Sequence, residues 1–176
     1  MSAANITLIQ SLYAAFGRGD IATIINAMTP DVDWHVNGRR EDYPLLGHWK
    51  GRDEVQKFFQ GVAEHEEAKD FSPRDFFAAE DRVFVLGHYA WTIRKTGRGV
   101  ACDWVHVFTI KSGKVAKFQE FNDTAQFAEA YRGGRRVRRR GITRKASFRD
   151  FAHPADRHVR TSGPLAFFQA SIPPWM

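Results

Sequence analysis

Apolar and polar residues alternate through most of residues 82–123. Three such runs, at 82–94, 100–110 and 115–123, are rich in aromatic and β-branched residues, and each gap between them is short and contains glycine. Alternation with period two is typical of half-buried strands, and short glycine-containing gaps are typical of hairpins. The pattern therefore predicts an antiparallel meander around which the rest of the chain is organised.

Side chains on a strand alternate between the two faces of the sheet, so odd and even residue numbers predict which residues share a face. The even face combines large apolar groups with polar ones: His88, Trp104, His106, Phe118, Glu120 and Asn122. An apolar wall with a few polar groups is what a small-molecule pocket requires. The alternative for His88 and His106 is an ordinary hydrogen-bonded core histidine. The odd face, with Tyr89, Trp91, Val105 and Val107, predicts a contact with a second subunit.

The residues before this meander predict mainly helices. Helical spacing runs through residues 3–17, Asp20 is placed to cap a second helix, and a third has Val55, Phe58, Phe59 and Val62 on one face. A short strand is expected at 32–36, an edge strand at 71–79, and a closing helix at 124–131. Residues 64–70 are interpreted as the solvated end of the third helix. The loop at 37–51 is unusually apolar, which one explanation attributes to a lid over a pocket.

Helices followed by a curved antiparallel sheet predict an α+β fold in which the helices cover the concave face of the sheet. Three stretches and the end of the meander also resemble the nuclear transport factor 2-like superfamily, within it the SnoaL-like and ketosteroid-isomerase-like branch: 16–20, 29–34, 51–59 and 113–124. The resemblance covers roughly residues 5–131. It implies a cone-shaped α+β barrel with three N-terminal helices, a pocket inside the cone, and a homodimer formed through the outer sheet face.

The same resemblance frames the candidate chemistry. Where ketosteroid isomerases carry their catalytic residues, this chain has Val36, Leu12 and His106, so a different acid/base set is expected. The candidate catalytic residues are His106, Glu120, Tyr13 and His35, with His106 as the acid/base group, Glu120 as its orienter or as the base, and Tyr13 as a donor to a developing enolate. The remaining candidates line the substrate pocket: Trp34, Trp49, Phe58, His88, Trp104, Phe118 and Asn122.

Two functions follow from this set. The first is a cofactor-independent cyclase, isomerase or hydrolase that moves a proton next to a carbonyl of a small hydrophobic molecule. The second is a non-catalytic ligand-binding or dimeric accessory protein. Two histidines and a carboxylate also suit iron or zinc, but no HxH, HExxH or CxxC spacing occurs, so neither a metal nor a cofactor is predicted.

Charge divides the 176-residue chain into two parts. Residues 1–132 carry 16 Lys+Arg and 18 Asp+Glu, whereas residues 133–176 carry 10 Lys+Arg and 2 Asp. The main domain, 1–132, therefore gives no reason to expect a nucleic-acid partner. The extension, 133–176, lacks helix or strand periodicity and has five arginines within 135–140; it is expected to be disordered or a gene-end artefact, with non-specific phosphate binding as the alternative.

Hydropathy and cysteine usage bear on location. No stretch of the sequence approaches the length of a membrane span, and residues 1–16 lack the features of a signal peptide. The single cysteine, Cys102, cannot form an internal disulfide. Together these features predict a cytoplasmic protein without a membrane partner.

Overall fold

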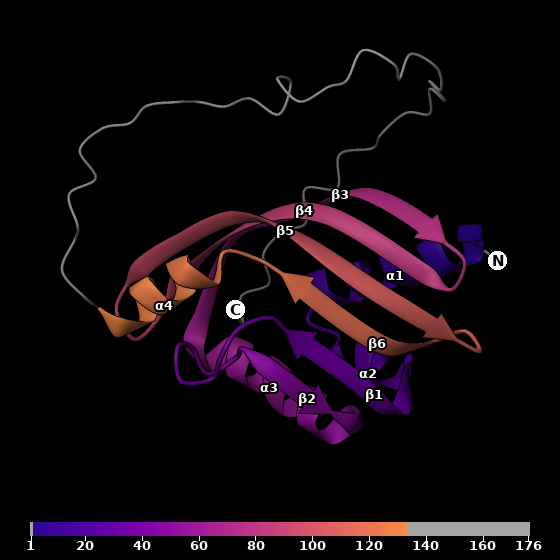
Figure 1. Cartoon of the computed structure of the whole chain (residues 1–176), viewed down its shortest axis with the longest axis horizontal. Helices are drawn as coiled ribbons and strands as arrows, with labels where there is room; N and C mark the ends of the chain where they lie inside the picture. The colour runs from indigo at the N-terminus through magenta and orange to yellow at the C-terminus, as the bar shows by residue number, and fades with distance from the viewer. Residues whose placement is uncertain (1, 134–176) are drawn as a thin grey trace, which may run out of the picture. The chain divides into compact units, whose positions relative to one another are not determined.

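The computed structural model describes residues 2–133, which form one curved sheet with helices packed against it (Figure 1). The α+β architecture predicted from the sequence is confirmed. Its elements are, in chain order, α1 (Ser2–Gly17), α2 (Ile21–Asn26), β1 (Met28–Val36), β2 (Gly47–Lys50), α3 (Gly51–His65), β3 (Glu66–Ala79), β4 (Arg82–Ile93), β5 (Arg98–Lys111), β6 (Lys114–Phe121) and α4 (Thr124–Arg132).

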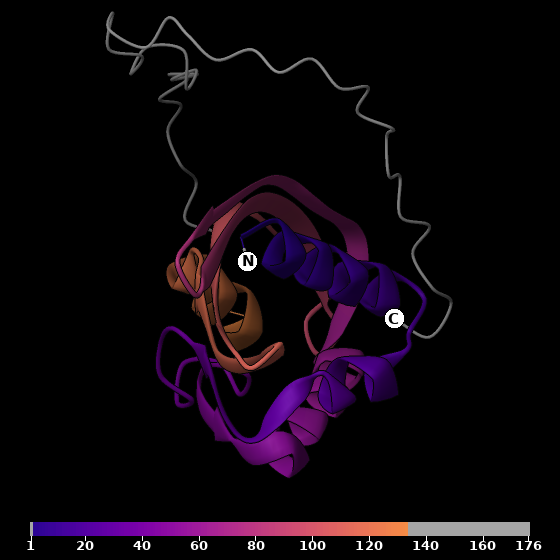
Figure 2. The same cartoon turned by 90° about the vertical axis from the view of Figure 1, so that its right-hand side faces the viewer.

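The six strands lie in the order β2-β1-β6-β5-β4-β3. Strands β4 to β6 form the predicted antiparallel meander, and β3, which includes the edge strand predicted at 71–79, extends it. Strand β1 then pairs with β6 in parallel, so the sheet is mixed rather than purely antiparallel. Because β2 and β3 remain as edges, the sheet is strongly curved but does not close into a barrel. Figure 2 shows the strands curving around helix α1.

The helices use the signals expected from the sequence. The side chain of Asp20 accepts the backbone N–H of Thr23 at 3.0 Å, which confirms the predicted cap of α2. Helix α3 buries Val55, Phe58, Phe59 and Val62, the face predicted from their spacing. These apolar faces close the concave side of the sheet and leave room there for a cavity.

The interpretation of residues 64–70 as the solvated end of a helix is wrong. Helix α3 stops at His65, and β3 begins at the next residue, Glu66, which pairs with Ile93 of β4. Glu66 is only 6% exposed. A cluster of charged residues resembles a solvated surface in the sequence, but here Glu66 turns inward because the pairing of β3 with β4 determines its direction.

The assignment of the even positions of β4 to the inner face is also wrong. Buried residues of β4 are odd-numbered, whereas the central buried residues of β5 are even-numbered. The hairpin pairs Val85 with His106 and Gly87 with Trp104, and directly opposed residues point to the same face. Because four residues connect β4 to β5, the inward-facing residues are odd-numbered on β4 and even-numbered on β5. As a result, Tyr89 and Trp91 face inward and His88 faces outward.

Gly87 is required because the ring of Trp104 fills the space beside it. A Cβ atom at position 87 would lie 2.2 Å from Cζ2 of Trp104, whose ring stacks on His106 at 3.9 Å. Gly87→Ala is therefore expected to lower the free energy of unfolding by about 1–3 kcal/mol through overpacking. Chemical denaturation measures this loss.

The matched control is Gly99→Ala on the neighbouring strand. A Cβ atom there would meet nothing closer than 3.9 Å. Equal losses from both substitutions would mean that the effect comes from the strand backbone and not from Trp104.

The basic extension predicted after the main domain lies beyond Gly133 and so outside the described residues. Within residues 2–133, no helix combines the length and the apolar content needed to cross a membrane.

Candidate functional site

A cavity opens between the concave sheet face and the helices, with about 860 Å³ of empty space including its mouth. Most of the wall is aliphatic or aromatic. Its residues come from α1, α3, the sheet and the loop before β2. Besides the tryptophans Trp34 and Trp91, seven side chains with polar atoms interrupt this wall: Tyr13, Tyr43, Glu66, Tyr89, His106, Glu120 and Asn122. An apolar cavity with a few convergent polar groups can hold and orient a small molecule.

His106 is the centre of the first polar group. It is 5% exposed and forms part of the cavity wall. Its ring stacks on that of Trp104, with ring centroids 3.9 Å apart. The hydroxyl of Tyr13 on α1 lies 2.8 Å from its Nδ1 atom. Its Nε2 atom lies 3.4 Å from Oε2 of Glu120, the residue directly opposite on β6. This contact lacks hydrogen-bond geometry, so Nε2 has no hydrogen-bond partner among the described residues.

Glu120 is held by a second set of partners. Its Oε1 atom accepts hydrogen bonds from the Tyr89 hydroxyl at 2.9 Å and from Nδ2 of Asn122 at 2.8 Å. Burial by itself would raise the pKa of Glu120, but the neighbouring His106 and the two hydrogen bonds outweigh it and hold this pKa below its ordinary value. Glu120 is therefore ionised at neutral pH.

The ionised Glu120 determines the tautomer of His106. A carboxylate oxygen beside Nε2 favours a proton on that nitrogen. In this tautomer, Nδ1 accepts the hydrogen of the Tyr13 hydroxyl. Burial and the negative charge of Glu120 raise the pKa of Tyr13, which keeps this hydroxyl protonated. Tyr13, His106 and Glu120 thus form a chain from α1 across β5 to β6, with a hydrogen bond between the first two and a 3.4 Å charge contact between the last two.

Glu66 and Tyr43 form a separate polar pair in the same cavity. The hydroxyl of Tyr43, in the loop before β2, donates to Oε1 of Glu66 at 2.8 Å. Burial raises the pKa of Glu66 to about 8; the hydrogen bond from Tyr43 opposes this shift and the charge of Glu120 adds to it. At neutral pH the cavity therefore holds one neutral carboxyl group and one ionised one, and such separation is typical of acid/base sites.

The structure places most of the residues predicted from the sequence in this cavity. Of the four catalytic candidates, it brings together Tyr13, His106 and Glu120. Of the pocket candidates, Trp34, Phe58, Phe118 and Asn122 line the wall.

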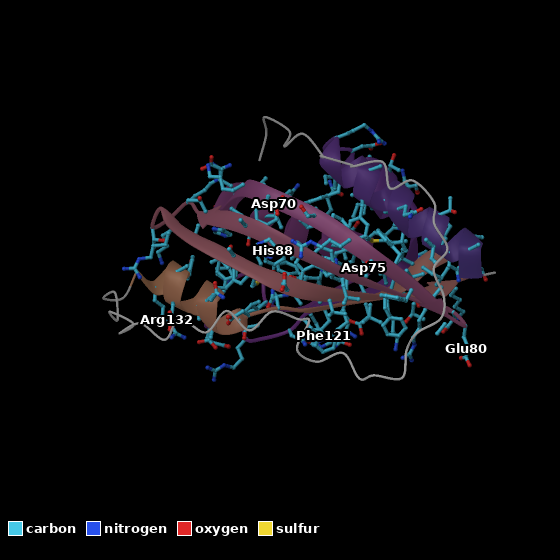
Figure 3. The ribbon with its side chains drawn as sticks, turned by 90° about the horizontal axis from the view of Figure 1, so that it is seen from above. Asp70, Asp75, Glu80, His88, Phe121 and Arg132 are labelled. Atoms are coloured by element: carbon cyan, nitrogen blue, oxygen red, sulfur yellow. The ribbon has the colours of Figure 1, made fainter. Side chains whose placement is uncertain are left out.

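Four candidates lie elsewhere. His35 points away from the cavity because its neighbours Trp34 and Val36 face inward, and its ring stacks on His48 with centroids 3.8 Å apart. His88 lies on the outer face of the sheet, the side seen in Figure 3, where its Nδ1 atom is hydrogen-bonded to Oδ1 of Asp103 at 2.9 Å. Trp104 lies behind His106, and Trp49 packs at the edge of Phe58, with ring centroids 5.7 Å apart. None of these four belongs to the cavity wall.

Three polar wall residues were not among the predicted site residues. Tyr89 was assigned to the subunit contact through the wrong parity, and Glu66 to a solvated helix end. Tyr43 lies within the loop at 37–51, which the sequence singles out only for its apolar content. The one sequence signal that could have found Glu66 is its position directly after the apolar face of α3, where a strand was expected soon afterwards.

No group of three or more His, Cys, Asp or Glu side chains is arranged to bind a metal ion among residues 2–133. Cys102 is a free, partly buried cysteine outside the cavity wall. Burial raises the pKa of its thiol, so it is a poor nucleophile at neutral pH.

Comparisons with known proteins agree with this architecture. An NTF2-like protein of Burkholderia pseudomallei is 31% identical, with a TM-score of 0.67 over 74% of this chain and 98% of its own. TerC, crystallised with polyporic acid, is 30% identical, with a TM-score of 0.64 over 73% of this chain and 98% of its own. An uncharacterised protein of Mycobacterium tuberculosis is 23% identical over 118 residues, covering 67% of this chain and 88% of its own.

The model of the SnoaL-like domain matches residues 9–118, a stretch that includes most of the cavity wall and extends from α1 into β6. The resemblance noted in the sequence is confirmed. This chain belongs to the SnoaL-like domain family and has the NTF2-like fold.

Proposed function

We propose that this protein binds a small, mainly apolar molecule in its cavity and moves a proton next to a carbonyl of that molecule, as a cofactor-independent isomerase or cyclase. The observation that carries this proposal is the chain from the Tyr13 hydroxyl through His106 to the ionised Glu120. A proton-transfer relay requires this order: a group at the ligand, a basic group that can accept its proton, and a fixed charge behind that group.

The relay works in both directions. As a base, Tyr13 takes a proton from the ligand while its own proton passes to Nδ1 of His106. The resulting imidazolium is stabilised by Glu120, 3.4 Å from Nε2. As an acid, the imidazolium returns its proton to Tyr13, whose hydroxyl protonates the ligand. Because burial raises the pKa of Tyr13, a free phenolate is unfavourable, and the two proton movements are coupled.

The apolar wall determines the kind of ligand. Trp34 and Phe118 stack with ring centroids 3.7 Å apart, and further aromatic rings from α1, α3 and β5 complete the wall. Such a surface favours a flat, apolar body with few polar atoms. The relative TerC was crystallised with polyporic acid, which makes this compound a reasonable binding probe here.

Deuterium exchange tests the proposed reaction without knowledge of the natural substrate. Deoxybenzoin has two aromatic rings and an acidic CH2 group beside its carbonyl. In heavy water, the full-length protein is expected to speed exchange of these hydrogens well above the buffer rate, as followed by NMR. Tight binding of deoxybenzoin or polyporic acid without faster exchange would favour the alternative function, a ligand-binding protein that performs no chemistry.

We also propose that the protein forms a homodimer through the outer face of the sheet. Cross-strand pairs place Phe77 beside Phe84 and Val105 beside Phe121 on this face. Phe77 is 56% exposed and Phe121 is 44% exposed, and exposed apolar groups of this size often mark an interface. Figure 3 shows Phe121 at this side of the sheet.

Sedimentation velocity at micromolar concentration is expected to show a dimer, and Phe121→Lys is expected to shift it toward monomer. A wild-type protein that sediments as a monomer at this concentration would rule out the dimer. Glu80→Lys, an exposed change in the turn after β3, serves as a charge control.

A further inference from the structure

We propose that Glu66, held in place by Tyr43, is a second ligand-contacting residue of the cavity. The free oxygen Oε2 of Glu66 donates a hydrogen bond to a carbonyl-type acceptor oxygen of the ligand. This inference rests on the proposed function and names the ligand group that the cavity recognises. The relay of Tyr13, His106 and Glu120 does not use Glu66, so the two parts can be tested separately.

The geometry of Glu66 supports a role in contacting a ligand. Its side chain is buried and belongs to the cavity wall. Tyr43 donates to Oε1 at 2.8 Å, which fixes the orientation of the carboxyl group. Oε2 makes no hydrogen bond to any other described residue, and it is not one of the fully enclosed unpaired atoms, so it is open to the cavity. A ligand oxygen would provide the missing partner.

The surroundings of Glu66 explain why it can donate. Two titratable groups act on it: the hydrogen bond from Tyr43 in the loop favours a negative charge on Glu66, and the charge of Glu120 on β6 opposes it. The Nε atom of Arg94 donates a hydrogen bond at 2.9 Å to the backbone carbonyl of Glu66, and not to its carboxyl group. His65 and Tyr131 pack around Tyr43. With no cation on the carboxyl group, burial raises the pKa of Glu66 to about 8 and keeps its proton at neutral pH.

The ligand class follows from this arrangement. Glu66 lies on β3 and Glu120 on β6, with β4 and β5 between them. A ligand that meets Glu66 and the Tyr13 relay needs an apolar body that extends across these strands. It also needs an acceptor oxygen at one part and an exchangeable hydrogen at another. An aromatic ketone satisfies both requirements.

Deoxybenzoin is a suitable probe because it has no group that titrates near neutral pH. Its dissociation constant can be measured on the full-length protein through the fluorescence of Trp34 and Trp91, which line the cavity. At pH 6.5, Glu66→Leu is expected to weaken binding by about tenfold or more, whereas Glu66→Gln keeps a donor and binds nearly as wild type. Between pH 6.5 and 9, wild-type binding should weaken by a similar factor while Glu66→Gln stays constant.

The neighbouring Glu67→Gln is the matched control because Glu67 is partly exposed and pairs with Lys69. It should follow the wild type at both pH values. Unchanged binding by Glu66→Leu, or the same pH profile in wild type and Glu66→Gln, would overturn the role of Glu66 alone. A wild type that binds no deoxybenzoin would instead contradict the proposed function and this inference with it.

Discussion

Replacing His106 with glutamine is expected to lower the rate of deuterium exchange in bound deoxybenzoin by about a hundredfold or more. Glutamine keeps a polar group of similar size between Tyr13 and Glu120, but it cannot carry a proton from one to the other. The Tyr13 hydroxyl, 2.8 Å from Nδ1 in the wild type, then has no base to receive its proton. NMR exchange rates at saturating probe measure the effect.

Stability separates this role from that of a core histidine. If His106 only fills space and bonds Tyr13, its removal should cost about 1–3 kcal/mol and leave ligand affinity unchanged. Under the relay, His106→Gln should lose exchange while its melting temperature and its affinity for deoxybenzoin change little. His88→Gln, on the outer face, is the matched histidine control and should exchange at the wild-type rate. Normal exchange in His106→Gln would remove this residue from the reaction.

The second large effect is expected in the pH dependence of folding. The pKa of Glu66 is about 8 in the folded protein, against an ordinary value of 4.5. A raised carboxyl pKa stabilises the folded state fully below pH 4.5, and this contribution falls as the pH rises toward 8 because the unfolded chain loses its proton first. At 1.36 kcal/mol per pKa unit, the full loss across the whole range amounts to about 5 kcal/mol. Glu66→Gln cannot ionise and should not show it.

Urea denaturation at several pH values tests this expectation. The free energy of unfolding of Glu66→Gln, minus that of the wild type, should grow by about 4 kcal/mol between pH 5 and pH 8.5. Glu120 has a lowered pKa, and its opposite contribution at acidic pH is common to both proteins and cancels in the difference. Glu67→Gln should give a constant difference. Parallel stability curves for wild type and Glu66→Gln would mean that Glu66 ionises as it would in water.

Comparison of the expected and observed site shows which signals were reliable. His106, Glu120 and Asn122 were found because β5 and β6 keep a uniform alternation, so parity identified the inner face. Tyr13 was found from the resemblance and from helical spacing on α1. His88 and Tyr89 were exchanged between faces because a single hairpin connection decides the parity of β4 relative to β5, and its register is set by the paired backbone.

The sequence by itself determined the elements and the fold class, because hydrophobic periodicity and caps such as Asp20 act over a few neighbouring residues. Only the tertiary structure decided which polar groups meet. The contact of Tyr13 with His106 joins residues 93 positions apart, and that of Tyr43 with Glu66 joins residues 23 apart. Burial, and with it the neutral state of Glu66 and the ionised state of Glu120, depends on how the helices close over the sheet, which no local pattern specifies.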